Sequence, residues 1–283
     1  MAADLLAPLL RLLSWLPFES LHAQFMQRAV LEALVMAPLC AMMGTLTIQF
    51  RMAFFSDAIA HSAFTGVAIG LLFGINPWFS VIVFGVFMGI LTARIRRKAD
   101  LAMDTSLGVL FSSTVALGLA IISSQKGLGK SLPNFLYGDI LSVNESDILA
   151  AMFLFVVVFC FLWFFFNKLV FIGLHEHLAK ASEIPADTLE LLFAGLLALV
   201  VAFSIKAVGI LLVTALLIIP SAAAGNISRS LRTQVWVAVA FSLFSSLAGL
   251  ASSVTFDTAT GASIILWAAA AFVISLMFKR DQA

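Results

Sequence analysis

Charged residues are scarce in this sequence of 283 residues. Lys, Arg, Asp and Glu together make up 11% of it, whereas soluble domains contain about a quarter, and hydrophobic residues make up 62%. Such a chain has no room for a sizeable water-soluble domain, so an all-α, polytopic helical membrane protein is expected. A membrane β-barrel is excluded because runs such as 150–166 are continuously apolar, without alternation. The net charge of +1 implies no attraction to nucleic acid.

Motifs for catalysis and nucleotide binding are also missing. There is no HExxH, no nucleophile elbow and no carboxylate cluster within the apolar runs. The segment 124–131 ends like a phosphate-binding loop, but Ser124 stands where glycine is required and no strand precedes it. The two cysteines, Cys40 and Cys160, fall in apolar runs and are expected to be small buried hydrophobes. The chain is therefore not expected to be an enzyme, and any energy from ATP must come from another polypeptide.

Apolar runs of the ~20 residues that a membrane helix needs follow one another almost without pause. The candidates are 30–50, 55–74, 78–95, 105–124, 147–171, 188–206, 208–227, 234–253 and 261–278. The connection at 206–209 is very short, and Pro220 and Gly225 are able to break the helix that follows, so eight or nine spans are predicted. Residues 1–28, with Arg11 and two prolines, are predicted to form an interfacial segment, and 29–280 the transmembrane domain.

Basic residues set the predicted orientation. The cluster Arg94, Arg96, Arg97 and Lys98 is the strongest positive-inside signal. Placing it in the cytoplasm also places there Arg51, Lys168, Lys180, Arg229, Arg232, Lys279 and Arg280. A minority, Lys126, Lys130 and Lys206, then falls outside. The C-terminus is predicted to be cytoplasmic, and Arg11 and Arg28 weakly favour the same side for the N-terminus.

Two segments do not look like simple spans. Residues 131–143 are half apolar and contain Pro133 and Gly138, which favours a short helix or re-entrant segment on the outer side. Residues 175–185, HEHLAKASEIP, are polar and lie between two long spans on the cytoplasmic side. A short surface helix in 175–185 would be free to dock against a soluble partner.

An aspartate and a histidine stand inside one predicted span. Asp57 and His61 are four residues apart, so on a helix they share one face. Ionisable side chains in a membrane normally face a bundle interior or a water-filled path, and an acid with an imidazole suits Zn, Mn and Fe. The alternative is structural: Asp57 caps the helix and His61 makes an interhelical hydrogen bond. The sequence alone weighs these two hypotheses about equally.

Other polar residues are weaker candidates. His175 and His177 point to different sides of a helix and are more typical of surface histidines than of a shared metal site. Glu32 is an isolated acid that could line a path, although a position at a helix end near the membrane interface is favoured.

Five stretches together resemble one family. They are RMAFFSDAIAHSAFTGVAIG (51–70), DTSLGVLFSSTVALGL (104–119), FLYGDILSV (135–143) followed by Asp147, VGILLVTALLIIPSAAA (208–224) and FDTATGASIIL (256–266). In this order they resemble the permease subunits of ATP-binding-cassette (ABC) importers for zinc, manganese and chelated iron, over about residues 30–280. Where relatives often have glycine before the aspartate, this chain has Ser56, which is still small enough for close packing.

The resemblance implies roles for particular residues. The family's acid and histidine, which lie on the metal path, match Asp57 and His61. The segment that couples such permeases to the ATP-binding subunit matches 175–185. The residues implied to form this coupling surface are His175, Glu176, His177, Leu178, Ala179, Lys180 and Glu183.

The resemblance also implies partners and a location. Such permeases work as a pair of identical copies on two cytoplasmic ATP-binding subunits, fed by an extracytoplasmic metal-binding protein. The implied location is the bacterial cytoplasmic (inner) membrane, and no permanently bound cofactor is expected. Zn²⁺ is favoured as the transported ion because the FDT opening of the last helix resembles zinc permeases and Asp–His ligation suits zinc, although Mn²⁺ and Fe²⁺ suit both ligands too.

Two rival functions stay open at this point. A secondary transporter driven by an ion gradient predicts an internal repeat with matching broken helices, and no convincing repeat is visible. An intramembrane metalloenzyme would need a further ligand and an acid or base near Asp57 and His61, and the sequence supplies no clear candidate.

Overall fold

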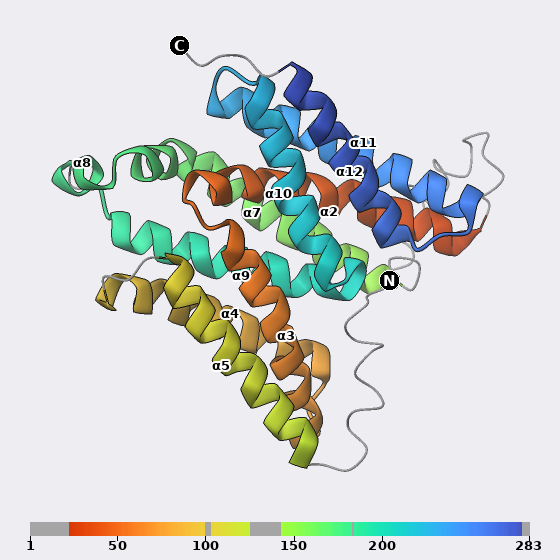
Figure 1. The fold of residues 1–283 in the computed structure, drawn as a ribbon, viewed down its shortest axis with the longest axis horizontal. Helices are drawn as coiled ribbons and strands as arrows, with labels where there is room; N and C mark the ends of the chain where they lie inside the picture. The colour runs from red at the N-terminus through yellow and green to blue at the C-terminus, as the bar shows by residue number, and fades with distance from the viewer. Residues whose placement is uncertain (1–22, 100–102, 125–142, 183, 279–283) are drawn as a thin grey trace. The chain divides into compact units, whose positions relative to one another are not determined.

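A computed structural model describes residues 23–99, 103–124, 143–182 and 184–278 (Figure 1). Every regular element in these ranges is an α-helix, which confirms the predicted all-α fold. The elements are α2 (Gln24–Gln49), α3 (Ala53–Phe73), α4 (Pro77–Ala99), α5 (Met103–Ser124), α7 (Glu145–Leu174), α8 (Glu176–Ala181), α9 (Ala186–Val208), α10 (Ile210–Ile227), α11 (Leu231–Phe256) and α12 (Thr260–Met277).

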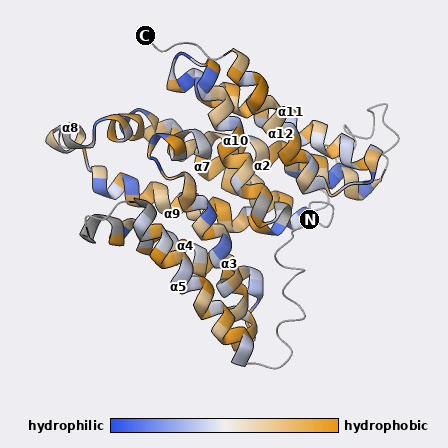
Figure 2. Ribbon diagram, viewed as in Figure 1, coloured by the Kyte–Doolittle hydropathy of each residue, from blue (hydrophilic) through white to orange (hydrophobic). Residues whose placement is uncertain are grey.

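The predicted number of spans is confirmed. Eight helices in the described ranges are long and apolar enough to cross a membrane, and the apolar stretch Leu212–Ile227 of α10 is a shorter ninth. Figure 2 shows hydrophobic residues along the length of these helices. α2 begins at Gln24, so the last residues of the predicted interfacial segment 1–28 belong to a spanning helix. The rest of that segment, and nearly all of 131–143, lie outside the described residues.

The helix that Pro220 and Gly225 could have broken is continuous. α10 runs through Pro220 and Gly225 to Ile227. Membrane helices tolerate proline where neighbouring groups satisfy the freed backbone. The predicted short connection before α10 is a single residue, Gly209, whose positive φ of 81° is a conformation that glycine adopts without a steric penalty.

The chain forms two compact units. One contains the described parts of 46–138 and 162–214, and the other contains those of 1–45, 139–161 and 215–283. In the first unit α3 packs against α4, α5 and α9. Glycines make this packing close: a Cβ on Gly66 would lie 2.9 Å from the Cα of Val81, and one on Gly89 would lie 2.5 Å from the Cβ of Ala198.

In the second unit, hydroxyl groups join α2 to its neighbours. Ser221 Oγ on α10 donates to the carbonyl oxygen of Ala41 at 3.1 Å, and Ser242 Oγ on α11 donates to that of Ala37 at 2.9 Å. α11 and α12 pack together in the same unit. These hydrogen bonds are available because small side chains let the helix backbones approach.

Two predictions about single residues are wrong. Cys160 is exposed, whereas Cys40 is buried as expected, because few of the residues in the apolar span of α7 are covered by other helices. Glu32 does not end a helix: it lies two turns inside α2 and is fully buried. Arg28 lies one turn before Glu32 on α2. Its side chain pairs with Glu145 of α7 at 2.8 Å.

Candidate functional site

The aspartate and the histidine lie side by side on α3, as their spacing predicts. His61 Nε2 is 3.7 Å from Asp57 Oδ1. The side chain of Asp57 is 46% exposed and that of His61 is 40% exposed. Ser56, the departure from the family pattern, is fully buried and its hydroxyl bonds to the carbonyl of Ala53. The close packing expected at this position is therefore present.

The structural alternative for this pair finds no support. The N-cap of α3 is Met52, which gives no side-chain cap, and Asp57 lies beyond the first turn. Among the described residues, His61 has an ion-pair contact with Asp57 and a ring contact with Phe111, and no hydrogen bond to another helix. Within the described residues, Asp57 therefore does not cap α3 and His61 does not join α3 to another helix through a hydrogen bond.

The distance between the two donor atoms is somewhat longer than the separation of two ligands of one metal ion. Two donors bound to one tetrahedral zinc ion at about 2.0–2.1 Å are about 3.3 Å apart, so a small side-chain movement from the 3.7 Å found here would let both reach one ion. Two ligands are fewer than a stable zinc site uses, and no group of three or more metal-binding side chains occurs in the described part of the chain. This pair alone is suited to weak, reversible binding.

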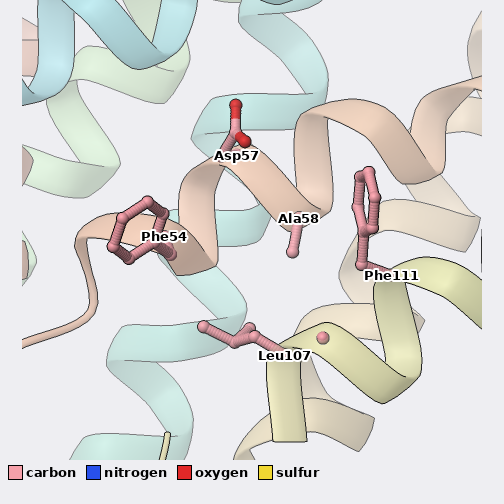
Figure 3. A pocket seen from close by; sticks show the side chains of 6 residues that line it. Phe54, Asp57, Ala58, Leu107 and Phe111 are labelled. Carbon is pink, nitrogen blue, oxygen red and sulfur yellow. The ribbon is translucent and has the colours of Figure 1, made fainter. Parts of the chain in front are cut away.

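A neighbouring helix provides an apolar wall beside the pair. A cavity of about 310 Å³ lies between α3 and α5 and is lined by Phe54, Asp57, Ala58, Leu107, Gly108 and Phe111 (Figure 3). Figure 3 shows Ala58, Leu107 and Phe111 around this space, with the Asp57 carboxylate pointing away from Leu107. The Phe111 ring is perpendicular to the His61 imidazole, with centroids 5.3 Å apart. Sequence reasoning missed Phe111, because nothing in the local pattern of α5 indicates which residue of α3 it contacts.

The segment 175–185 contains the predicted short helix, α8. His175 is the N-cap residue of α8 and is exposed, Leu178 is 56% exposed, and Ala179 is fully buried. The side chains of Glu176, His177 and Lys180, and residue 183, lie outside the described part of the structure. α8 therefore presents a leucine at the surface while it is anchored by an alanine.

Long apolar helices, one of which exposes an acid and an imidazole, define the class: a polytopic helical membrane protein with a polar site in its spanning part. The chain belongs to the ABC 3 transport family, whose sequence model matches residues 22–279. This match confirms the resemblance to permeases of ABC metal importers.

The relatives carry the names of metal transport proteins. "High-affinity zinc uptake system membrane protein ZnuB" of Haemophilus influenzae is 32% identical over 254 residues, covering 90% of this chain and 97% of that protein. "Manganese transport system membrane protein MntC" of Halalkalibacterium halodurans is 29% identical over 262 residues, covering 93% and 90%. "Probable iron transport system membrane protein" of H. influenzae is 30% identical over 266 residues, covering 94% and 97%.

A solved structure agrees with the fold. "PsaBC from Streptococcus pneumoniae in complex with Fab" resembles this chain with a TM-score of 0.78 at 30% identity, covering 100% of this chain and 98% of that one.

Proposed function

We propose that this chain is the permease subunit of an ABC importer that moves a divalent metal ion, Zn²⁺ in the first instance, into the cytoplasm. The observation that carries the proposal is the half-exposed Asp57–His61 pair on a spanning helix. Ionisable groups are costly in lipid, so this face of α3 must meet water, an ion or another protein. Family membership supplies the transport context.

A second copy of the chain would complete the site. One copy offers two donors, and a two-fold axis beside α3 would bring a second Asp57–His61 pair to the first. Four oxygen and nitrogen donors are a full set for tetrahedral Zn²⁺ and a partial one for octahedral Mn²⁺. The site would then exist only in the dimer, and a change in the separation of the two copies would release the ion.

The surface of α5 supports a protein neighbour here. Only 17% of the residues in its apolar span are buried, against 78% for α2. Gly108, Ser112 and Ala116 are exposed at four-residue spacing, and a Cβ on Gly108 would touch nothing within 4 Å. Small residues at this spacing let another helix approach closely in a membrane. Gly108 also lines the cavity that Asp57 lines, so this surface continues the candidate metal site.

Energy would come from two ATP-binding subunits, and the absence of a nucleotide motif from this sequence is consistent with that division of labour. α8 would be their docking point, with the exposed Leu178 entering an apolar depression of the partner. ATP binding and hydrolysis would switch the pair of permeases between outward-open and inward-open states. An extracytoplasmic metal-binding protein would deliver the ion.

Charge supports a cytoplasmic C-terminus, and the bacterial relatives support a location in a bacterial inner membrane. If every long helix crosses once, the ends of α2, α4, α7, α10 and α12 fall on one side. Arg51, Arg94, Lys168 and Arg229 follow or lie within these ends, in agreement with the positive-inside rule. Arg28 then lies on the outer side, as does its negative partner Glu145. In this topology Arg28 no longer favours a cytoplasmic N-terminus.

Two features of this chain favour zinc, the FDT opening at 256–258 that resembles zinc permeases and the Asp–His pair, but only the first discriminates zinc from manganese and iron. Relatives named for zinc, manganese and iron are all about 30% identical, so overall identity does not discriminate between the three ions. Manganese or iron would change the cargo and leave the rest of the proposal unchanged.

The test is ATP-dependent uptake in vesicles that contain this chain with its ATP-binding subunit and metal-binding protein. Zn²⁺, Mn²⁺ and Fe²⁺ are compared for the natural chain and for a chain with both Asp57→Ala and His61→Ala. We expect zinc accumulation, at least about 100-fold lower in the double variant, with normal assembly. Accumulation of manganese or iron instead would identify that ion, and not zinc, as the transported ion. Uptake without ATP would favour the transporter driven by an ion gradient.

A matched control separates a metal site from a structural pair. Ser113→Ala and Ser123→Ala together alter two exposed polar residues of α5 that lie outside the Gly108–Ser112–Ala116 surface, and they change no metal donor. This control should retain uptake. Loss of assembly in the Asp57/His61 variant, with assembly intact in the control, would show that the pair has a structural role and would contradict the metal-site proposal.

A further inference from the structure

An aromatic side chain on another helix contacts His61. The ring of Phe111 on α5 meets the imidazole of His61 at 89°, with centroids 5.3 Å apart. This edge-to-face arrangement is favourable because the positive edge of one ring meets the negative face of the other. Of the described residues that line the adjacent cavity, the remaining ones on α5 are Leu107 and Gly108, neither of which offers a side-chain hydrogen bond to the imidazole.

α5 is fixed against α3 one turn further along both helices. Thr65 Oγ1 donates a hydrogen bond of 2.6 Å to the carbonyl oxygen of Thr114, and both residues are buried. Another turn on, a Cβ on Gly118 would lie 2.5 Å from Thr65 Oγ1 and 2.8 Å from the ring of Phe64. Because α5 cannot slide or turn without losing these contacts, the position of Phe111 relative to His61 is set by packing.

We propose that Phe111 is a positioning residue for the metal-ligand pair. Its ring holds the His61 imidazole so that Nε2 faces Oδ1 of Asp57, the direction found in the structure. The inference rests on the proposed function, since it concerns the same two ligands. A preoriented imidazole loses less conformational freedom when the ion binds, so removal of the ring weakens binding without removing a ligand.

Uptake kinetics in the vesicles described above test this role. Phe111→Leu keeps an apolar side chain and removes the ring. We expect the metal concentration for half-maximal uptake to rise about three- to tenfold, with the maximal rate within about twofold of the natural chain. Phe111→Tyr keeps the ring and should restore the natural value. A purely structural role would lower the maximal rate through loss of folded protein and leave the half-maximal concentration unchanged.

The matched control is Phe87→Leu. Phe87 is an exposed phenylalanine of α4 in the same unit, and its ring contact is with Phe84. This variant should keep both kinetic values. An equal rise in the half-maximal concentration for Phe87→Leu and Phe111→Leu would overturn the proposal, because a general packing effect would then explain both.

A second variant tests the position of the ring by metal binding alone. Phe111→His places an imidazole beside His61, where it can act as a third ligand. We expect the purified complex to bind Zn²⁺ at least about tenfold more tightly in competition with a chelating dye, and to release it more slowly. The gain should vanish when His61→Ala is added. An unchanged affinity would show that residue 111 does not face the ligand pair.

The two proposals fail in distinguishable ways. If Asp57→Ala and His61→Ala leave uptake intact, the proposal that these two residues bind the transported ion is overturned. If those changes abolish uptake while Phe111→Leu behaves as the natural chain does, only the role of Phe111 is overturned.

Discussion

Two pairs of ionisable side chains in spanning helices differ in which helices they connect and in how exposed they are. Arg28 and Glu145 stand 117 positions apart on α2 and α7, meet at 2.8 Å and are 29% and 22% exposed. Asp57 and His61 stand four positions apart on α3, meet at 3.7 Å and are 46% and 40% exposed. The first pair joins two helices through a hydrogen-bonded ion pair. The second lies within one helix and leaves both side chains partly exposed, as a transient ion site requires.

The units that contain these pairs differ in the same sense. Around α2, polar groups cross from helix to helix: Ser221 and Ser242 bond to carbonyls of α2, and Asn226 donates to Ser275 at 2.9 Å. On the exposed side of α3 and α5, polar groups face outward. Substitutions in the first region should therefore reduce stability, and substitutions on the exposed face of the second should reduce transport by protein that is still folded.

The largest loss of stability is expected for Gly44→Ala. A Cβ there would overlap the carbonyl oxygen of Leu217 and lie 2.6 Å from Ser221 Oγ, so α2 and α10 would have to separate. Such overpacking should cost about 3 kcal/mol of unfolding free energy, measured by denaturant titration in detergent. The matched control is Gly108→Ala on α5, which meets nothing within 4 Å. Equal losses for the two glycines would remove the distinction between the regions.

Arg28→Ala is expected to have the next largest effect. Glu145 would lose its partner, and the buried Glu32 would lose a positive charge one turn away. Because the Arg28–Glu145 pair is partly exposed, the unfolding free energy should fall by about 2 kcal/mol. The charge-reversed double variant, Arg28→Glu with Glu145→Arg, should recover only the part that belongs to the Arg28–Glu145 pair, because it leaves Glu32 one turn from a second carboxylate. Asp57→Ala should not change the unfolding free energy. If Arg28→Ala instead abolished uptake at full stability, the ion pair would belong to the transport path.

Thr65→Val should have the smallest effect of the three. It removes the buried hydrogen bond to the Thr114 carbonyl while keeping the shape of the side chain, so a loss of about 1 kcal/mol is expected. Because this bond fixes α5 beside His61, the metal concentration for half-maximal uptake should also rise. An unchanged half-maximal concentration at reduced stability would show that α5 is positioned by other contacts.

The sequence by itself determined the helical membrane fold, nearly all of the span positions and the shared face of Asp57 and His61. Hydropathy over ~20 residues and a four-residue spacing are local properties, so no tertiary information is needed to read them. The order of five motifs also predicted the family correctly.

Only the tertiary structure decided which side chains are covered and by what. The burial of Glu32, the exposure of Cys160 and the contact of Phe111 with His61 depend on residues far away in the chain. The continuity of α10 through Pro220 was likewise not decided by the sequence, because proline both breaks and is tolerated in membrane helices. Burial and cross-helix geometry are set by packing partners, and a pattern along one helix does not identify those partners.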